Sequence, residues 1–260
     1  MFYEKYLKAT KEKGSFININ LDPALPKQRK KNVVPDRYVS NEDSETLLNF
    51  SLDIIEQVSD YCCSIKPNTQ YYLGHTELLK KIAKRIHHEG MLAILDHKLS
   101  DIGSTNHSAL YWINEMDFDA FTFSPFAGNT QKTVEKAHEN NLGVIVLTLM
   151  SNPEAEKMMI NTTIDGQPYY LHTAKTVKET EADGCVVGLT FFVEDEYIKN
   201  IQKVVGDKVV LLLQGIGPQG GQDSKIKYAR NPLVSLGRAV IYSDNPRKAV
   251  KRYHDTFKRF

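Results

Sequence analysis

Four charged side chains could form one reactive cluster. Asp96, Lys98 and Asp101 lie within one short segment, and Lys66 precedes them in the chain. Asp96 and Lys98 are two residues apart, so their side chains point to the same side of an extended strand. Charges in such a place need partners, and an alternating chain of two lysines and two aspartates keeps all four ionised. This acid–base cluster is suited to protonating a carbanion without a cofactor; a structural salt-bridge network is the alternative.

Two glycine-containing segments are typical of an anion-binding site. Backbone N–H groups in a glycine-rich turn such as Gly215–Gly221 can surround a phosphate. Arg238, next to Gly237, adds a forked donor that matches phosphate oxygens. Tight turns alone would also explain these glycines, above all at Gly217-Pro218. We favour phosphate binding, because barrels often bind phosphate with the segments that follow their last two strands.

The elements that must position these residues are short apolar segments, each followed by an amphipathic one. Eight segments have the length and continuous apolar character of strands that are buried on both faces. They are Phe16–Leu21, Tyr61–Ile65, Met91–Leu95, Ala120–Phe123, Gly143–Leu147, Gly184–Val187, Val209–Leu213 and Leu233–Leu236. Apolar residues at helical spacing or helix end signals predict helices between and after them. These are Ser44–Val58, Thr76–His88, Thr130–Asn140, Glu194–Val205 and Pro246–Lys258.

This alternation predicts an α/β fold, a (β/α)8 TIM barrel that forms a single domain over residues 1–260. Asp22, Lys66, Asp96 and Ser151 then follow strand ends, at the face where barrel enzymes hold their active sites. An open doubly wound sheet is the competing fold. No Gly-x-Gly-x-x-Gly follows the first strand, which disfavours a dinucleotide-binding sheet.

The composition is that of an ordinary globular protein. Apolar residues make up 41% and charged residues 25% of the 260 residues, and the net charge of +1 gives no bulk attraction to nucleic acid or membrane. The basic cluster of Lys27, Arg29, Lys30 and Lys31 is interpreted as a solvated loop. Three irregularly spaced cysteines, a polar N-terminus and the lack of a long apolar run indicate a cytoplasmic protein. No zinc-binding motif is present, so no metal is expected.

Taken together, the motifs resemble those of the orotidine 5'-monophosphate decarboxylase family. The family signature Asp-x-Lys-x-x-Asp-Ile-x-x-Thr is matched in full by Asp96, Lys98, Asp101, Ile102 and Thr105. Further segments are similar to family motifs and follow the family order from residue 21 to residue 246. They are Leu21-Asp22-Pro23, Ile65-Lys66, Met150-Ser151-Asn152-Pro153, Gly217-Pro218-Gln219-Gly220-Gly221 and the segment Gly237–Tyr242.

The resemblance implies a cofactor-independent carboxy-lyase of pyrimidine biosynthesis. It would be a homodimer with shared active sites that converts orotidine 5'-monophosphate to UMP and CO2, with neither nucleic acid nor membrane as a partner. The implied catalytic residues are Lys98, which would protonate C6, with Asp96, Asp101 and Lys66. The implied substrate-binding residues are Asp22 and Lys66 at the ribose, Ser151 at the pyrimidine, Gln219, Gly237 and Arg238 at the phosphate, and Ile102, Thr105, Pro218 and Gly220. Asp101 and Thr105 would reach into the neighbouring subunit's site.

Two departures from the family pattern and two other functions remain open. Gln214-Gly215 replaces the usual Pro-Gly, and Pro218 replaces a small residue, which removes an N–H group and stiffens the loop. A metal-dependent phosphosugar enzyme on the same barrel, such as a keto-gulonate-phosphate decarboxylase or a hexulose-phosphate synthase, would be revealed by a chelator. A non-catalytic nucleotide-binding protein would bind UMP without turnover. The longest segments expected to be irregular are 23–41 and 152–165, both of which follow strands, and the segment 23–41 is assigned no role.

Overall fold

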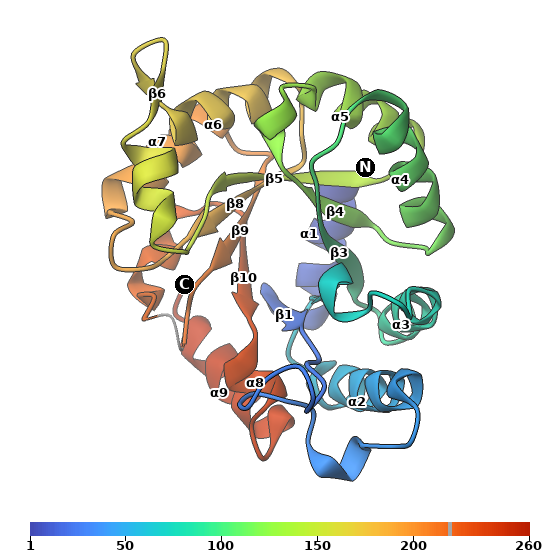
Figure 1. The fold of residues 1–260 in the computed structure, drawn as a ribbon. Helices are drawn as coiled ribbons and strands as arrows, with labels where there is room; N and C mark the ends of the chain where they lie inside the picture. The colour runs from blue at the N-terminus through green and yellow to red at the C-terminus, as the bar shows by residue number, and fades with distance from the viewer. Residues whose placement is uncertain (218–219) are drawn as a thin grey trace.

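Eight parallel strands close into a barrel in the computed structural model, which describes residues 1–217 and 220–260 (Figure 1). Neighbouring strands follow the order β1, β10, β9, β8, β5, β4, β3, β2. Their bounds are β1 Ile17–Leu21, β2 Ser64–Pro67, β3 Leu92–Leu99, β4 Ala120–Phe123, β5 Gly143–Leu149, β8 Gly184–Gly188, β9 Val210–Gln214 and β10 Pro232–Leu236. The predicted (β/α)8 barrel is confirmed, and each predicted segment overlaps one strand, although β2 begins three residues later than predicted.

Helices cover the outside of the barrel. Their bounds are α2 Asp43–Val58, α3 Glu77–His88, α4 Gly103–Glu115, α5 Thr130–Glu139, α6 Tyr169–Glu179, α7 Asp195–Val205, α8 Arg238–Ile241 and α9 Pro246–Phe257. The predicted helices correspond to α2, α3, α5, α7 and α9. The sequence analysis missed α4, α6 and the short α8. In α4 only Asn106, Leu110 and Ile113 are buried, so its apolar periodicity is weak.

The seventh βα unit departs from the regular pattern. Between β9 and β10 the chain forms a 3-10 helix, η5 (Asp223–Tyr228), in place of an α-helix. The buried Lys225 of η5 donates to the carbonyl oxygens of Thr190 at 3.2 Å and Val193 at 2.6 Å. These bonds tie η5 to the segment between β8 and α7.

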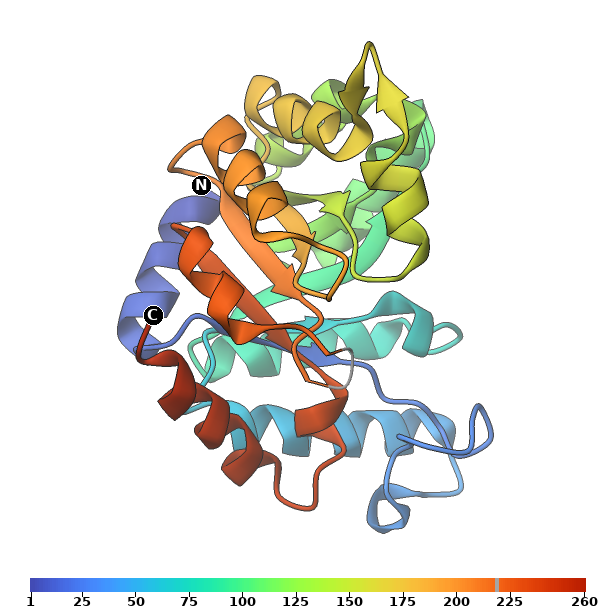
Figure 2. The ribbon, with the colours of Figure 1, turned by 90° about the vertical axis from the view of Figure 1, so that its left-hand side faces the viewer.

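An additional helix, α1 (Phe2–Lys13), closes the N-terminal end of the barrel. Phe2 and Tyr6 are buried against inward-facing strand residues, and Tyr6 Oη donates to the carbonyl of Pro232 at 2.8 Å. A Cβ atom at Gly143 would lie 2.6 Å from the Phe2 side chain, so glycine is needed for this close approach. In Figure 2 the strands run from the side of α1 toward the opposite side, where the connecting loops gather. The C-terminal ends of the strands therefore lie on the side of the barrel opposite α1.

The interior of the barrel changes character along its axis. Near α1 the buried cluster is apolar and includes Ile94 and Leu212. Nearer the C-terminal end, Asn18 Nδ2 donates to Ser235 Oγ at 3.0 Å and Ser64 Oγ donates to Asn18 Oδ1 at 2.9 Å. These polar side chains come from β1, β2 and β10, and each of their polar atoms has a hydrogen-bond partner within the barrel. They form a polar layer below the charged residues Lys66 and Asp96, which lie nearer the C-terminal ends of β2 and β3.

Two segments expected to be irregular differ in structure. The segment 23–41 contains one short 3-10 helix, η1 (Asp36–Tyr38). The segment 152–165, in contrast, holds a π-helix, η4 (Glu156–Ile160), and a strand, β6 (Thr163–Ile164), which pairs antiparallel with β7 (Gln167–Pro168). The prediction of irregular structure was therefore wrong for the second segment.

The basic cluster is solvated only in part. Lys27, Lys30 and Lys31 are exposed, as expected. Arg29 is half-buried, with its guanidinium carbon 5.7 Å from the centre of the Tyr71 ring and 5.8 Å from that of Tyr242. It also donates to both tyrosine hydroxyls. The solvated-loop interpretation was therefore wrong for Arg29, which anchors the segment 23–41 to the barrel rim.

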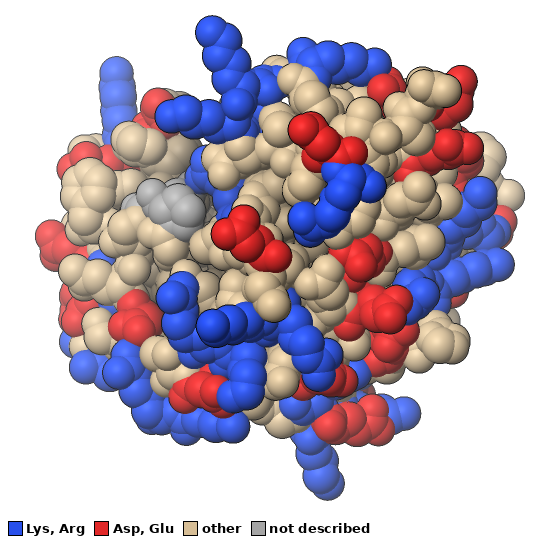
Figure 3. Space-filling view, turned by 90° about the horizontal axis from the view of Figure 1, so that it is seen from below, with Lys and Arg blue, Asp and Glu red and all other residues tan. Residues whose placement is uncertain are grey.

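Acidic and basic side chains are interspersed on the face shown in Figure 3, so this face is neither uniformly positive nor uniformly negative. Among the described helices, none is long and apolar enough to cross a membrane.

Candidate active site

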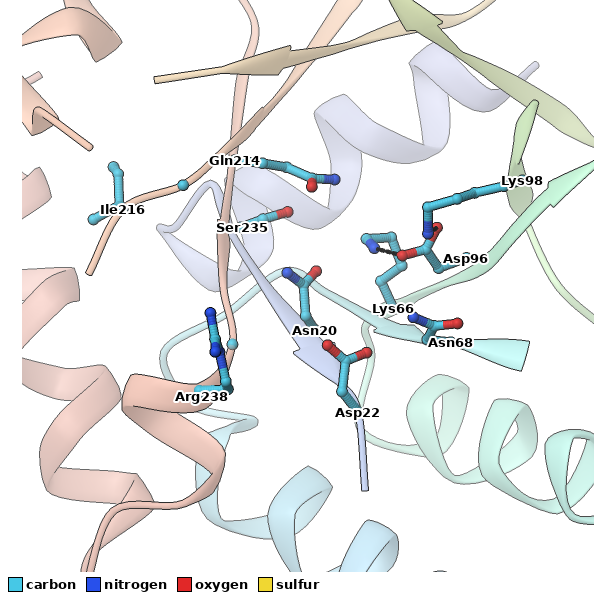
Figure 4. A pocket seen from close by; sticks show the side chains of 12 residues that line it. Asn20, Asp22, Lys66, Asn68, Asp96, Lys98, Gln214, Ile216, Ser235 and Arg238 are labelled. Atoms are coloured by element: carbon cyan, nitrogen blue, oxygen red, sulfur yellow. Dashed lines mark hydrogen bonds and ion pairs between the residues drawn. The ribbon is translucent and has the colours of Figure 1, made fainter. Parts of the chain in front are cut away.

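A polar cavity lies at the C-terminal end of the barrel (Figure 4). Its walls come from β1, β2, β3, β9 and β10 and from the segments that follow them. The lining residues are Asn20, Asp22, Lys66, Asn68, Asp96, Lys98, Gln214, Gly215, Ile216, Ser235, Gly237 and Arg238. The structure thus brings together Asp22, Lys66, Asp96, Lys98, Gly237 and Arg238 from the predicted set.

Asp96 is the centre of the charge cluster. Its Oδ2 accepts a hydrogen bond from Lys66 Nζ, and its Oδ1 accepts from Lys98 Nζ at 2.7 Å. Burial alone would raise the pKa of Asp96, but the two ammonium groups outweigh it and hold the pKa well below the usual range. Lys66 is 1% exposed, whereas the Lys98 side chain is 41% exposed and faces the cavity. The cluster therefore presents one accessible ammonium group on an ionised, buried carboxylate.

The backbone at Lys98 leaves the regular strand. Leu95 pairs with Phe121 and Leu99 pairs with Phe123, so β3 has two more residues than β4 between these pairs. Within this bulge Lys98 has φ of +52°, a left-handed conformation that costs a non-glycine residue about 1 kcal/mol or more. The predicted Asp96–Lys98 contact is present, but the regular strand on which that prediction depended is not.

Asp101 does not join this cluster. Its side chain is exposed, and its Oδ1 accepts from the neighbouring Ile102 N–H at 2.8 Å. Ile102 and Thr105 are also exposed. The prediction that all four charges pair within one chain was therefore wrong, because the segment between β3 and α4 carries Asp101 away from the cavity. Asn129 Nδ2 holds this segment through the Asp101 carbonyl at 2.9 Å.

Asp22, the residue directly after β1, has an oxygen without a hydrogen-bond partner in the part of the chain that the structure describes. Its Oδ1 is shut off from solvent and has no hydrogen-bond partner within the described residues. Burial raises the pKa of Asp22, and the ammonium group of Lys66 counters only part of this effect. A buried acceptor without a partner is costly, so this oxygen is available for a donor on a bound molecule.

The glycine-rich segment after β9 turns tightly. Gly215 and Gly217 have φ of 102° and 95°, in the region that favours glycine. Gly221 N donates to the Gly215 carbonyl at 2.9 Å, and a Cβ at Gly221 would lie 2.5 Å from that oxygen. The segment is therefore closed at its base by a contact that only glycine permits. Pro218 and Gln219, predicted to contact the ligand, lie outside the described residues.

The opposite side of this turn is formed by the segment after β10. Arg238 begins α8 and is exposed, and Figure 4 shows its guanidinium directed toward the cavity. Arg238 has no ion pair with any residue that the structure describes. Gly220 is exposed and is not among the lining residues. A cation and a glycine-rich backbone therefore face one another across one end of the cavity.

Ser151 is the remaining predicted residue. It is half-buried after β5 and does not line the cavity. It packs instead against Gly188 of β8, where a Cβ would lie 2.9 Å from Ser151 Cα.

Several polar residues of the site were missed by the sequence analysis. Asn20, Asn68, Gln214 and Ser235 line the cavity, and Thr122 Oγ1 donates to Asp96 Oδ1 at 2.9 Å. A signal existed in β1, whose sequence Ile-Asn-Ile-Asn-Leu alternates with period two and so places both asparagines on one face. Within the described part of the chain, no group of three His, Cys, Asp or Glu side chains is placed to hold a metal ion.

Comparisons with known proteins point to one family. A sequence model described as the orotidine 5'-phosphate decarboxylase / HUMPS family matches residues 43–253. The orotidine 5'-phosphate decarboxylase of Bordetella pertussis is 30% identical over 257 residues, covering 93% of this chain and 90% of that protein. The enzyme of the same name from Cupriavidus necator is 33% identical over 212 residues, covering 76% of each chain.

Solved structures agree on the fold. The OMP decarboxylase of Leishmania donovani superposes with a TM-score of 0.80 at 17% identity, covering 99% of this chain and 97% of that one. The orotidine 5'-monophosphate decarboxylase of Methanocaldococcus jannaschii, complexed with the inhibitor BMP, superposes with a TM-score of 0.71 at 23% identity, covering 93% and 97%.

Proposed function

Since this chain belongs to the orotidine 5'-phosphate decarboxylase / HUMPS family, we propose that it converts orotidine 5'-monophosphate to UMP and CO2, with Lys98 protonating C6. It is thus a carboxy-lyase of pyrimidine biosynthesis. The observation that carries the role of Lys98 is its position: an accessible ammonium group held at 2.7 Å by the ionised Asp96, inside the polar cavity.

The chemistry requires charge stabilisation at one carbon. When the bond from C6 to the carboxylate breaks, its electron pair stays on C6 and CO2 leaves. This negative charge exists only near the transition state, so a group that binds it there accelerates the reaction. The Lys98 ammonium is oriented by Asp96 before the reaction and needs no reorganisation. Lys98 then gives its proton to C6, and the neutral amine regains a proton from solvent.

The remaining residues would hold the nucleotide in place. The unpaired oxygen of Asp22 accepts a hydrogen bond from a ribose hydroxyl, and Lys66 also contacts the ribose. Arg238, the backbone of Gly237 and the glycine-rich segment with Pro218, Gln219 and Gly220 hold the phosphate at the other end of the cavity. Ser151 contacts the pyrimidine after a small movement of its segment. Binding energy from the phosphate, far from C6, lowers the barrier at the reacting carbon.

We also propose a homodimer in which Asp101, Ile102 and Thr105 complete the partner's site. Two observations support it: these residues are exposed and do not line their own cavity, and two large apolar side chains are exposed, Ile102 at 61% and Phe126 at 85%. A chain with Asp101→Ala mixed with a chain with Lys98→Ala would then form one intact site per heterodimer. Partial recovery of activity is expected; isolated heterodimers without activity would contradict the shared site.

A cytoplasmic location is proposed as well. The three cysteines are buried and free within the described residues, which suits a reducing compartment.

The direct experiment is an ultraviolet assay of orotidine 5'-monophosphate decarboxylation by the purified protein, before and after treatment with a chelator. Turnover that persists after chelation is expected. A strict requirement for a divalent metal would favour a phosphosugar enzyme of the same family. Tight UMP binding without turnover would favour a nucleotide-binding protein.

A further inference from the structure

We propose that Thr122 is a positioning residue for the decarboxylation, because its hydroxyl group joins the Asp96 carboxylate to the backbone of Lys98. The inference rests on the proposed function and extends it to a residue of β4 that does not line the cavity. Thr122 would act through Asp96 and Lys98 without touching the substrate.

The contacts of Thr122 define the direction of each hydrogen bond. Its side chain is fully buried, and Oγ1 lies 2.9 Å from Asp96 Oδ1 and 2.9 Å from the Lys98 backbone nitrogen. An ionised carboxylate only accepts and a backbone N–H only donates. The hydroxyl therefore donates to Asp96 and accepts from Lys98, and reversing this chain would leave both neighbours unsatisfied.

The bulge in β3 explains why such a link is needed. The regular pairing of β3 with β4 is interrupted between Leu95 and Leu99, so the ladder does not hold the Lys98 backbone. The Thr122 hydroxyl accepts the Lys98 N–H in place of a strand partner and supports the left-handed conformation there. A side chain from the neighbouring strand thus fixes the point from which the Lys98 side chain starts.

The same hydroxyl also fixes the point at which that side chain ends. Asp96 Oδ1 accepts both Thr122 Oγ1 and Lys98 Nζ, while Oδ2 accepts Lys66. Three donors from three strands hold the carboxylate in one orientation. Loss of the hydroxyl would release one of them, shift the carboxylate and move the ammonium group relative to C6. A displacement of about 1 Å at a reacting group can cost on the order of 100-fold in rate.

The test is Thr122→Val, which keeps the shape of the side chain and removes the hydroxyl. We expect kcat for orotidine 5'-monophosphate to fall by roughly 100-fold, with KM and the affinity for UMP within about twofold of the wild type, because Thr122 makes no proposed contact with the nucleotide. Thr122→Ser, which restores the hydroxyl, is expected to recover kcat to within about threefold.

The matched control is Thr148→Val, the same substitution at an equally buried threonine on β5. Its hydroxyl donates to the Val146 carbonyl at 3.1 Å and makes no hydrogen bond to the charge cluster within the described residues. We expect unchanged kcat. Melting temperatures and UMP binding of each variant show that it is folded; if Thr122→Val is not, the similarly sized Thr122→Cys, a weak donor, replaces it.

Three results would overturn the inference: a kcat for Thr122→Val close to wild type, a loss confined to KM, or a Thr122→Ser variant as slow as Thr122→Val. An equal loss in Thr148→Val would also overturn it, since general disturbance of the barrel would then explain the effect. A wild-type protein without turnover would contradict the proposed function instead, so the two failures are distinguishable.

Discussion

Buried aspartates occur at both ends of the barrel, but their partners differ. At the C-terminal end Asp96 is held by the side chains of Lys66, Lys98 and Thr122. At the N-terminal end Asp119, just before β4, accepts from the backbone N–H of Ala93 at 2.9 Å, from His87 Nε2 at 2.8 Å and from Lys5 Nζ at 2.8 Å.

The N-terminal arrangement occurs twice. Asp183, just before β8, accepts from the backbone N–H of Val144 at 2.9 Å and is bonded to His138 Nε2 at 2.9 Å. In both copies the neighbouring strand, β3 or β5, supplies the N–H group. The last turn of the helix before that strand, α3 or α5, supplies the histidine. Each aspartate therefore links a helix to two adjacent strands: Asp119 links α3 to β3 and β4, and Asp183 links α5 to β5 and β8.

The difference shows how similar charged groups serve different ends. At the N-terminal end each carboxylate bridges a strand and a helix, so its bonds stabilise the fold. At the C-terminal end the partners are side chains, one of them an accessible ammonium group, and Asp22 Oδ1 has no partner among the described residues. Of the four aspartates compared, the one with an unpaired oxygen therefore lines the cavity that a substrate can enter.

The largest effect should come from Lys98→Met. It removes both the proton donor and the charge at C6, so kcat should fall by roughly 10⁴-fold or more, while UMP still binds. The matched variant is Lys5→Met, which also removes a lysine 2.8 Å from a buried aspartate. It should leave kcat unchanged and lower the melting temperature slightly. Comparable losses of activity in both variants would erase the distinction between the two ends.

Asp119→Asn should act on stability alone. The neutral amide cannot accept from Lys5, His87 and Ala93 together, and hydrogen bonds to charged groups contribute about 1.5–3 kcal/mol. We expect urea denaturation to report a free energy of unfolding lower by about 2 kcal/mol, with kcat within about twofold of wild type. A large drop in kcat in the folded variant would show that the N-terminal end also serves catalysis.

Asp22→Asn should change stability and binding in opposite directions. The raised pKa of Asp22 means that its ionised form is disfavoured in the folded protein. A neutral amide should therefore raise the free energy of unfolding by up to about 1 kcal/mol and weaken orotidine 5'-monophosphate binding by roughly 10-fold. The measurements are a melting curve without ligand and KM; a destabilised variant with unchanged KM would refute the role of the unpaired oxygen.

The smallest effect is a pH dependence of stability. The hydrogen bonds to Asp119 and Asp183 raise the pKa values of His87 and His138. Their stabilisation is complete below the unfolded value of about 6.5 and is lost as pH rises through the folded values. Because both histidines are about one-third exposed, we expect less than about 1 kcal/mol in total. Urea midpoints measured across this range should decline less in a His87→Gln, His138→Gln variant than in wild type.

The sequence predicted the barrel and the central ion pairs for physical reasons. Buried parallel strands must be continuously apolar, and a lysine such as Lys66 within one must meet an acid such as Asp96. The left-handed Lys98 could not be predicted, because it results from the mismatch between β3 and β4. Thr122 was missed because a β-branched residue in a short apolar strand is ordinary.

Other errors came from the connections. The prediction for Asp101 assumed that residues close in sequence stay close to the cavity, but the start of α4 redirects the chain. The 3-10 helix η5, for which no prediction was made, lies where the (β/α)8 pattern has an α-helix, and its buried Lys225 donates to two carbonyls that are distant in the sequence. Such contacts are visible only after the chain has folded.

Arg29 connects the segment 23–41 to the active site through Tyr242, which matters when this loop is redesigned. Tyr242, whose ring Arg29 covers, donates to the backbone carbonyl of Asp22 at 2.6 Å and accepts from the Ala24 N–H at 2.8 Å. An engineer who shortens this loop, or exchanges it for the loop of a relative, removes the outer support of the tyrosine that holds Asp22. Loop grafting at this position would therefore alter nucleotide affinity, and a graft that keeps an arginine between Tyr71 and Tyr242 is the one to choose.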